Sequence, residues 1–148
     1  MNLVTGATGI LGIQVMAELI QRGEKVRGMK RQSADLNTVK NLLALRTGKE
    51  DAINQIDWIE GNVLDVTSLF EAMEGVDHVY HCAAVVSYHA DDRDAMYEIN
   101  VEGTANIVNV ALALGKPKIC FVSSIAALGK LQNNSSANET MHLLCACR

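Results

Sequence analysis

Short apolar runs along the chain alternate with longer stretches in which apolar residues recur every three or four positions. The first pair is the run at residues 3–5 followed by the stripe Ile13, Met16, Ala17 and Ile20. A short apolar run bounded by glycine predicts a strand, and the helical spacing predicts an amphipathic helix. Such alternation is typical of βαβ units around a parallel sheet.

The remaining elements follow the same alternation. Further strands are expected at residues 25–29, 57–60, 76–82 and 119–122. The last of these is a continuous apolar run, which favours a strand buried on both faces of the sheet. Helices are expected over 36–45 and 96–114. Between them, a short helix is expected to begin at a capping box formed by Ser68 and Glu71. These elements predict an α/β fold, a doubly wound parallel sheet of the Rossmann type ordered 3-2-1-4-5 and truncated after the fifth strand.

The pattern changes near residue 130. An Asn- and Ser-rich stretch leads into a short mixed segment that has no partner in the alternation. We therefore expect a Rossmann domain over residues 1–130 and a polar loop with a truncated tail over residues 131–148. A fifth strand left at the sheet edge can pair with another chain, so a homodimer and low solubility are both open.

Composition narrows the function classes. The chain has 148 residues, of which 49% are hydrophobic and 20% charged, the balance of one globular domain. Its formal net charge of −4 and 4% aromatic content argue against nucleic-acid binding. We find no signal peptide and no apolar run long enough to span a membrane, so a cytoplasmic protein with reduced cysteines is expected.

A glycine-rich loop joins the first strand to the first helix. It contains Gly6, Thr8, Gly9, Ile10, Leu11 and Gly12. Glycines here let the backbone approach a pyrophosphate, toward which the helix N-terminus directs its N–H groups and the favourable end of its dipole. Because a strand precedes the loop and an amphipathic helix follows, the motif predicts dinucleotide binding. The alternative is that the glycines only permit tight packing of strand and helix.

The end of the second strand indicates which dinucleotide is bound. An acid there hydrogen-bonds a ribose 2′-hydroxyl, whereas a cation favours a 2′-phosphate. The sequence has Lys30 and Arg31, and the planar guanidinium of Arg31 suits a phosphate best. NADP is therefore preferred over NAD. In the alternative, both cations are solvated and Asp35 serves NAD.

Several motifs in order extend this picture. The Gly-x-x-Gly-x-x-Gly spacing is followed by Gly61-Asn62-Val63-Leu64-Asp65, His81-Cys82-Ala83-Ala84, Asn100-Val101-Glu102-Gly103-Thr104 and Phe121-Val122-Ser123-Ser124. Together they resemble the extended short-chain dehydrogenase/reductase family over residues 1 to about 130. Within it the chain is most similar to the NAD(P)-dependent epimerase/dehydratase group, especially its dihydroflavonol-reductase-like and 3β-hydroxysteroid-dehydrogenase-like branches.

The resemblance implies a role for each motif. Ile10 and Leu11 would cover the pyrophosphate, and Asn62 with the backbone of Val63 would meet the adenine. Asn100 would brace the sheet and the proton path from its helix. Ser124 would be catalytic, donating a hydrogen bond to the carbonyl or hydroxyl of the substrate. The crevice beside the cofactor would be lined by Cys82, Ala83 and Ala84.

The family implies hydride transfer between nicotinamide and a small carbonyl or hydroxyl compound, or a nucleotide sugar. Its Tyr-x-x-x-Lys pair is absent, because Tyr80, Tyr88 and Tyr97 are followed four residues on by Ala, Asp and Val. Two alternatives to an enzyme domain therefore stay open: a non-catalytic module that binds or senses NADP(H), and an inactive truncated gene product. We interpret His81 as a hydrogen-bonded core group, and no metal site is expected because His142, Cys145 and Cys147 are too few ligands for zinc.

Overall fold

The computed structural model describes residues 1–115 and 117–124. All five expected strands form, and they pair in parallel in the order β3-β2-β1-β4-β5, which confirms the doubly wound topology. The strands are β1 (Asn2–Thr5), β2 (Val26–Lys30), β3 (Ile56–Glu60), β4 (His78–His81) and β5 (Lys118–Phe121).

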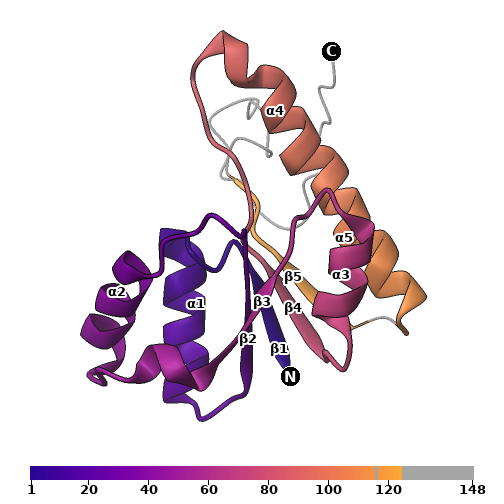
Figure 1. The fold of residues 1–148 in the computed structure, drawn as a ribbon. Coiled ribbons are helices and arrows are strands. Elements are labelled where there is room, and N and C mark those ends of the chain that lie inside the picture. The colour runs from indigo at the N-terminus through magenta and orange to yellow at the C-terminus, as the bar shows by residue number, and fades with distance from the viewer. Residues whose placement is uncertain (116, 125–148) are drawn as a thin grey trace, which may run out of the picture.

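Helices cover both faces of the sheet. In Figure 1, α1 and α2 lie on one side of the strands, and α3 and α5 lie on the other. The helical segments are α1 (Ile10–Gln21), α2 (Asn37–Thr47), η1 (Ala52–Gln55), α3 (Val66–Met73), η2 (Ala90–Asp92), α4 (Arg93–Tyr97), η3 (Glu98–Glu102) and α5 (Gly103–Ala113). No helix among the described residues is long and apolar enough to cross a membrane.

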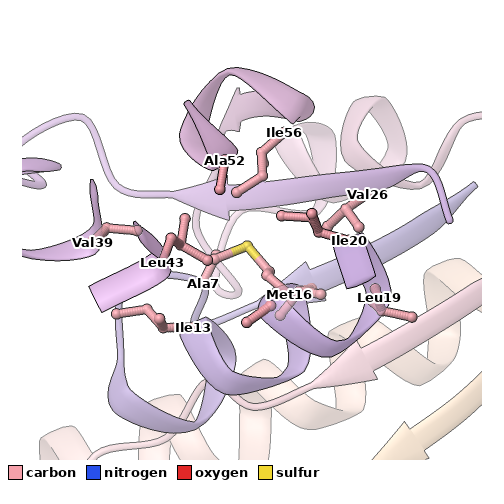
Figure 2. Close-up of a cluster of buried hydrophobic side chains, with 12 residues drawn as sticks. Ala7, Ile13, Met16, Leu19, Ile20, Val26, Val39, Leu43, Ala52 and Ile56 are labelled. Atoms are coloured by element: carbon pink, nitrogen blue, oxygen red, sulfur yellow. The ribbon is translucent and has the colours of Figure 1, made fainter. Parts of the chain in front are cut away.

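Two hydrophobic clusters, one on each face, hold the helices to the sheet. The first joins α1 and α2 to the strands, and Met16 and Leu43 lie at its centre with no exposed surface (Figure 2). The second joins α3 and α5 to the opposite face and includes Leu69 and Ile107. The predicted stripe of α1 is thus buried, and each face of the sheet is packed against a pair of helices.

The predicted capping box at Ser68 is wrong. Helix α3 begins three residues earlier, and its N-cap is Asp65, whose side chain accepts a hydrogen bond from the Thr67 amide at 3.0 Å. The Ser68 hydroxyl lies inside the helix and donates to the Asp65 carbonyl at 2.9 Å, and it accepts from the Asn62 amide at 3.1 Å. Asp65 is the cap because its carboxylate accepts a hydrogen bond from a free amide of the first turn, whereas the Ser68 hydroxyl bonds the preceding loop at Asn62.

The long helix expected over 96–114 contains an irregularity that periodicity does not reveal. It runs without a break through α4, η3 and α5, and η3 is a π-helical turn. Gly103, Ile107 and Val110 are buried as predicted, whereas Leu114 is 42% exposed. A π turn rotates the helix face, and such turns are frequent at functional sites.

The burial predicted for the fifth strand is also wrong. All four residues of β5 are exposed, with Phe121 at 53%. The strand lies at the edge of the sheet, beside β4, and within residues 1–115 and 117–124 no strand pairs with its outer side. The predicted polar loop and tail, 131–148, lie outside the described residues, as do His142, Cys145 and Cys147.

Candidate functional site

A cavity of about 320 Å³ lies at the carboxyl edge of the sheet. In a doubly wound sheet this edge, where the strand order reverses between β1 and β4, is the usual place for a ligand. Residues at the ends of β1, β2, β3 and β4 line the cavity, and Ile99 of the π turn closes one side. The lining residues are Gly6, Thr8, Gly9, Met29, Lys30, Arg31, Gly61, Asn62, Val63, Leu64, Cys82, Ala83, Ala84, Val85 and Ile99.

The glycine loop after β1 is shaped by contacts that exclude side chains. Gly6 has a φ of 64°, and a Cβ there would lie 2.7 Å from the Ala83 amide nitrogen. A Cβ on Gly12 would overlap the Gly6 carbonyl oxygen. The Gly9 amide donates to that same carbonyl at 2.9 Å. The loop therefore packs backbone against backbone, both with the start of α1 and with the segment after β4.

The start of α1 leaves donors without acceptors. No side chain caps this helix. The first amide to pair is that of Ile13, which donates to the Gly9 carbonyl at 2.9 Å, and the amides of residues 10–12 make no hydrogen bond to any described residue. Free amides and the positive end of the helix dipole together form a site that attracts an anion such as a phosphate.

The two cations after β2 have different surroundings. The Lys30 ammonium lies 3.2 Å from a Glu60 carboxylate oxygen on β3, and its side chain is only 16% exposed. Arg31 is exposed and its side chain has no partner among the described residues. Asp35, the alternative partner for a ribose, accepts hydrogen bonds from the amide and side chain of Asn37 and is held at the start of α2. Of these two cations, Arg31 is therefore the one whose charge is available to a ligand in the cavity.

The loop after β3 also lines the cavity. The Asn62 side-chain oxygen accepts from the Leu64 amide at 3.1 Å, which leaves one of its two lone pairs for a ligand. Val63 is buried against α5, where a Cβ on Gly103 would lie 2.6 Å from the Val63 methyl group. The side chain of Asn106 on α5 also donates to the Val63 carbonyl at 3.1 Å. The loop is therefore held by α5 from behind.

The segment after β4 forms the wall nearest the first loop. The Ala83 amide donates to the Thr5 hydroxyl at 3.3 Å. Both polar atoms of the Asn100 amide pair with the Val85 backbone, each at 2.8 Å. Asn100 thus braces this segment, while the part in a proton path that the resemblance implies stays a prediction.

Burial favours the uncharged forms of two titratable groups in β4 and the segment after it, His81 and Cys82. Burial raises the pKa of the Cys82 thiol to about 11, and Cys120 on the neighbouring strand adds to this, so the thiol is neutral near pH 7. His81 is 1% exposed, and burial lowers its pKa. It hydrogen-bonds Thr5 at 2.7 Å and Thr104 at 3.0 Å, which confirms its interpretation as a core group. Cys82 and Cys120 are both free thiols.

Ten of the predicted site residues line this one cavity. They are Gly6, Thr8, Gly9, Lys30, Arg31, Asn62, Val63, Cys82, Ala83 and Ala84. Gly12 and Asn100 do not line the cavity, but they contact residues that do: Gly12 packs against Gly6, and Asn100 hydrogen-bonds the Val85 backbone. The contact of Ile10 and Leu11 with a pyrophosphate stays a prediction, and the side chain of Ile10 is 86% exposed.

Sequence reasoning missed five lining residues. Four of them, Met29, Gly61, Leu64 and Val85, directly precede or follow a predicted site residue, so extending each loop by one position finds them. Ile99 likewise directly precedes a predicted site residue, Asn100, but it lies in the π turn, which apolar periodicity does not reveal.

Ser124 follows β5 by three residues and is exposed, and it does not line the cavity. It lies beyond the carboxyl end of β5, at the same sheet edge as the cavity. Among the described residues no group of three or more His, Cys, Asp or Glu side chains is arranged to hold a metal ion.

Comparison with known families and relatives identifies what this chain is similar to. The NAD dependent epimerase/dehydratase family matches residues 2–144. Sterol demethylase protein B of Methylococcus capsulatus is 34% identical over 138 residues, which are 93% of this chain and 38% of that protein. A putative dihydroflavonol 4-reductase of Synechocystis is 33% identical over 137 residues, 93% of this chain and 36% of the relative.

Among solved structures, a short-chain dehydrogenase/reductase superfamily protein from Agrobacterium tumefaciens with bound NAD superposes with a TM-score of 0.72. It is 30% identical, and the match covers 97% of this chain and 38% of that one. The chain thus spans less than two fifths of the length of each of these proteins.

Proposed function

Because the chain belongs to the NAD-dependent epimerase/dehydratase family, we propose that its cavity binds a pyridine dinucleotide, with NADP preferred over NAD. The observation that carries this proposal is the start of α1, where the amides of residues 10–12 are unpaired and the glycine loop has no room for a Cβ at Gly6 or Gly12. The pyrophosphate of the dinucleotide rests there, because the amides supply donors and the helix dipole supplies a favourable potential.

The remaining lining residues are assigned to the two ends of the dinucleotide. Asn62 and the Val63 backbone meet the adenine, and the free lone pair of the Asn62 oxygen accepts from its amine. The small side chains of Cys82, Ala83 and Ala84 leave space for the nicotinamide end. The bound cofactor supplies hydride chemistry, and the chain supplies binding and orientation.

The preference for NADP rests on Arg31. Lys30 already pairs with Glu60, so its charge is partly neutralised, whereas the Arg31 guanidinium is exposed beside the cavity and unpaired within the described part of the chain. A planar guanidinium binds a phosphate through two parallel hydrogen bonds. Arg31 therefore binds the 2′-phosphate that distinguishes NADP from NAD.

For the complete protein we assign hydride transfer between the nicotinamide and a carbonyl or hydroxyl carbon of a small molecule. The names of the relatives support this, since one is a putative dihydroflavonol 4-reductase. Ser124 donates to the substrate oxygen from the carboxyl end of β5.

Calorimetric titration of the 148-residue chain with NADPH and with NADH tests the proposal. Arg31→Ala is expected to weaken NADPH binding about tenfold, the loss of roughly 1.4 kcal/mol from a charge-assisted contact, and to leave NADH binding unchanged. Arg46→Ala removes an exposed arginine of α2 outside the cavity and serves as the matched control.

Two results would overturn the assignment at different levels. If neither dinucleotide binds the wild-type chain, the cavity is not a cofactor site. If both bind with equal affinity and Arg31→Ala changes neither, dinucleotide binding stands and the 2′-phosphate assignment is wrong.

A further inference from the structure

A chain of side-chain hydrogen bonds crosses the buried centre of the molecule behind the cavity. The Thr5 hydroxyl of β1 lies 2.7 Å from the Nδ1 atom of His81 on β4. The Nε2 atom of the same ring lies 3.0 Å from the Thr104 hydroxyl of α5. That hydroxyl in turn donates to the carbonyl of Asn100, in the π turn, at 2.7 Å. Thr5 and His81 are both almost fully buried.

The partners at the two ends of this chain fix where its protons lie. The Asn100 carbonyl can only accept, so the Thr104 proton points to it and the Thr104 oxygen must accept from His81. The Nε2 atom therefore carries the ring proton. Because a neutral ring carries only one ring proton, Nδ1 is then bare and accepts the Thr5 hydroxyl proton, while the Thr5 oxygen accepts from the Ala83 amide. A neutral ring protonated at Nε2 gives every proton of the chain an acceptor.

Both ends of the chain reach the same wall of the cavity. At one end Thr5 holds the Ala83 amide at 3.3 Å. At the other end Thr104 holds the carbonyl of Asn100, whose side chain forms both hydrogen bonds to the backbone of Val85. Ala83 and Val85 line the cavity, whereas His81, Thr5 and Thr104 do not.

We propose that His81 is a positioning residue for this cavity: as a neutral ring protonated at Nε2, it links β1, β4 and the π turn and so holds Ala83 and Val85 in place. The ring keeps β1 and α5 at a fixed separation, because each of its nitrogens bonds one of them. The effect on cofactor affinity rests on the proposed function, whereas the tautomer and the tethering of the wall do not.

The test removes one hydroxyl and then restores it. Thr104→Val keeps the shape of the side chain but leaves the His81 Nε2–H unpaired and removes the side-chain hydrogen bond to the Asn100 carbonyl, and Thr104→Ser returns the hydroxyl. Thr47→Val is the matched control, because Thr47 on α2 also donates to a carbonyl four residues earlier, that of Leu43, at 2.7 Å and outside the cavity lining.

We expect Thr104→Val to weaken the binding of NADPH, measured by calorimetry, about tenfold, the loss of a hydrogen bond that orders a binding wall. Thr104→Ser should return affinity to within about twofold of wild type, and Thr47→Val should lower the melting temperature with no change in affinity. Equal weakening by Thr47→Val would reduce the effect to general destabilisation and overturn the proposal.

Nuclear magnetic resonance gives a readout that needs no ligand. In the wild-type chain near pH 7, nitrogen spectra of the His81 ring should show a protonated Nε2 and a bare Nδ1. In Thr104→Val, the amides of Ala83 and Val85 should exchange faster with solvent while those of α2 keep their rates. A ring protonated at Nδ1 would overturn the proposal even if Thr104→Val fails to fold. Absence of dinucleotide binding together with the expected ring and amide spectra would instead reject the proposed function alone.

Discussion

At the scale of single residues, Gly6 and Gly23 illustrate two reasons why a position requires glycine: a left-handed backbone, and a lack of space for a Cβ. Both have a left-handed backbone, with φ of 64° and 72°, but a Cβ on Gly6 would strike Ala83, whereas nothing lies within 4 Å of one on Gly23. Gly23→Ala should cost about 1 kcal/mol of unfolding free energy from backbone conformation alone. Gly6→Ala should cost roughly 1–3 kcal/mol more from overpacking and abolish dinucleotide binding.

Urea unfolding and calorimetric titration measure the two quantities. Gly23→Ala should bind dinucleotide with wild-type affinity despite its lower stability. Equal stability losses in the two variants would show that the segment after β4 moves aside freely, so that the close approach of Ala83 to Gly6 does not exclude a side chain there.

His81 predicts how stability responds to pH. Burial lowers its pKa below the ordinary value of 6.5, so between the lowered pKa and 6.5 the unfolded chain binds more protons than the folded one. Stability is therefore fully present above pH 6.5 and falls as the pH drops through that window. His81→Gln should be less stable near pH 7.5, and its unfolding free energy should change less between pH 7.5 and 5.5. Denaturant unfolding at a series of pH values checks this, with the exposed His89 replaced by Gln as the control.

At the scale of elements, the start of α3 tests which residue caps it. Asp65→Ala should lower the free energy of unfolding by about 1 kcal/mol, because the Thr67 amide loses its acceptor. Glu71→Ala, which removes the acid of the expected capping box, should change it by less than about 0.5 kcal/mol. Chemical denaturation measures both. If Glu71→Ala lowered the free energy of unfolding more than Asp65→Ala does, the capping box predicted at Ser68 would be correct after all.

The contrast between α3 and the glycine loop shows how far local sequence predicts this molecule. The strand, loop and helix around Gly6 could be predicted because the spacing of apolar residues and of glycines is visible in consecutive residues, although the contact of Gly6 with Ala83 is made only in the folded chain. At α3, Asp65 and Ser68 are both good caps, and the choice depends on the pairing of Ser68 with Asn62, a contact made only in the folded chain. The cavity residue Ile99 depends in the same way on a π turn that leaves no mark on apolar periodicity.

At the scale of the whole molecule, the burial of β5 is the property that the apolar pattern predicted wrongly. The run 119–122 is as apolar as a central strand, but burial depends on which elements lie beside it, and β5 has a neighbour only at β4 among the described residues. The exposed fractions of Ile119, Phe121 and Val122 are 36%, 53% and 39%. An apolar edge with unpaired backbone groups invites pairing with another chain.

We therefore predict that the 148-residue chain associates as its concentration rises, and that Val122→Lys moves the association midpoint to about tenfold higher concentration. A lysine on each paired edge places like charges together, and its hydration opposes burial. Leu45→Lys is the control, because it removes an apolar side chain that is 77% exposed on α2, away from the edge. Sedimentation velocity over a concentration series gives both midpoints. If Leu45→Lys shifts the midpoint as far as Val122→Lys does, association follows general surface hydrophobicity, and β5 has no special part in it.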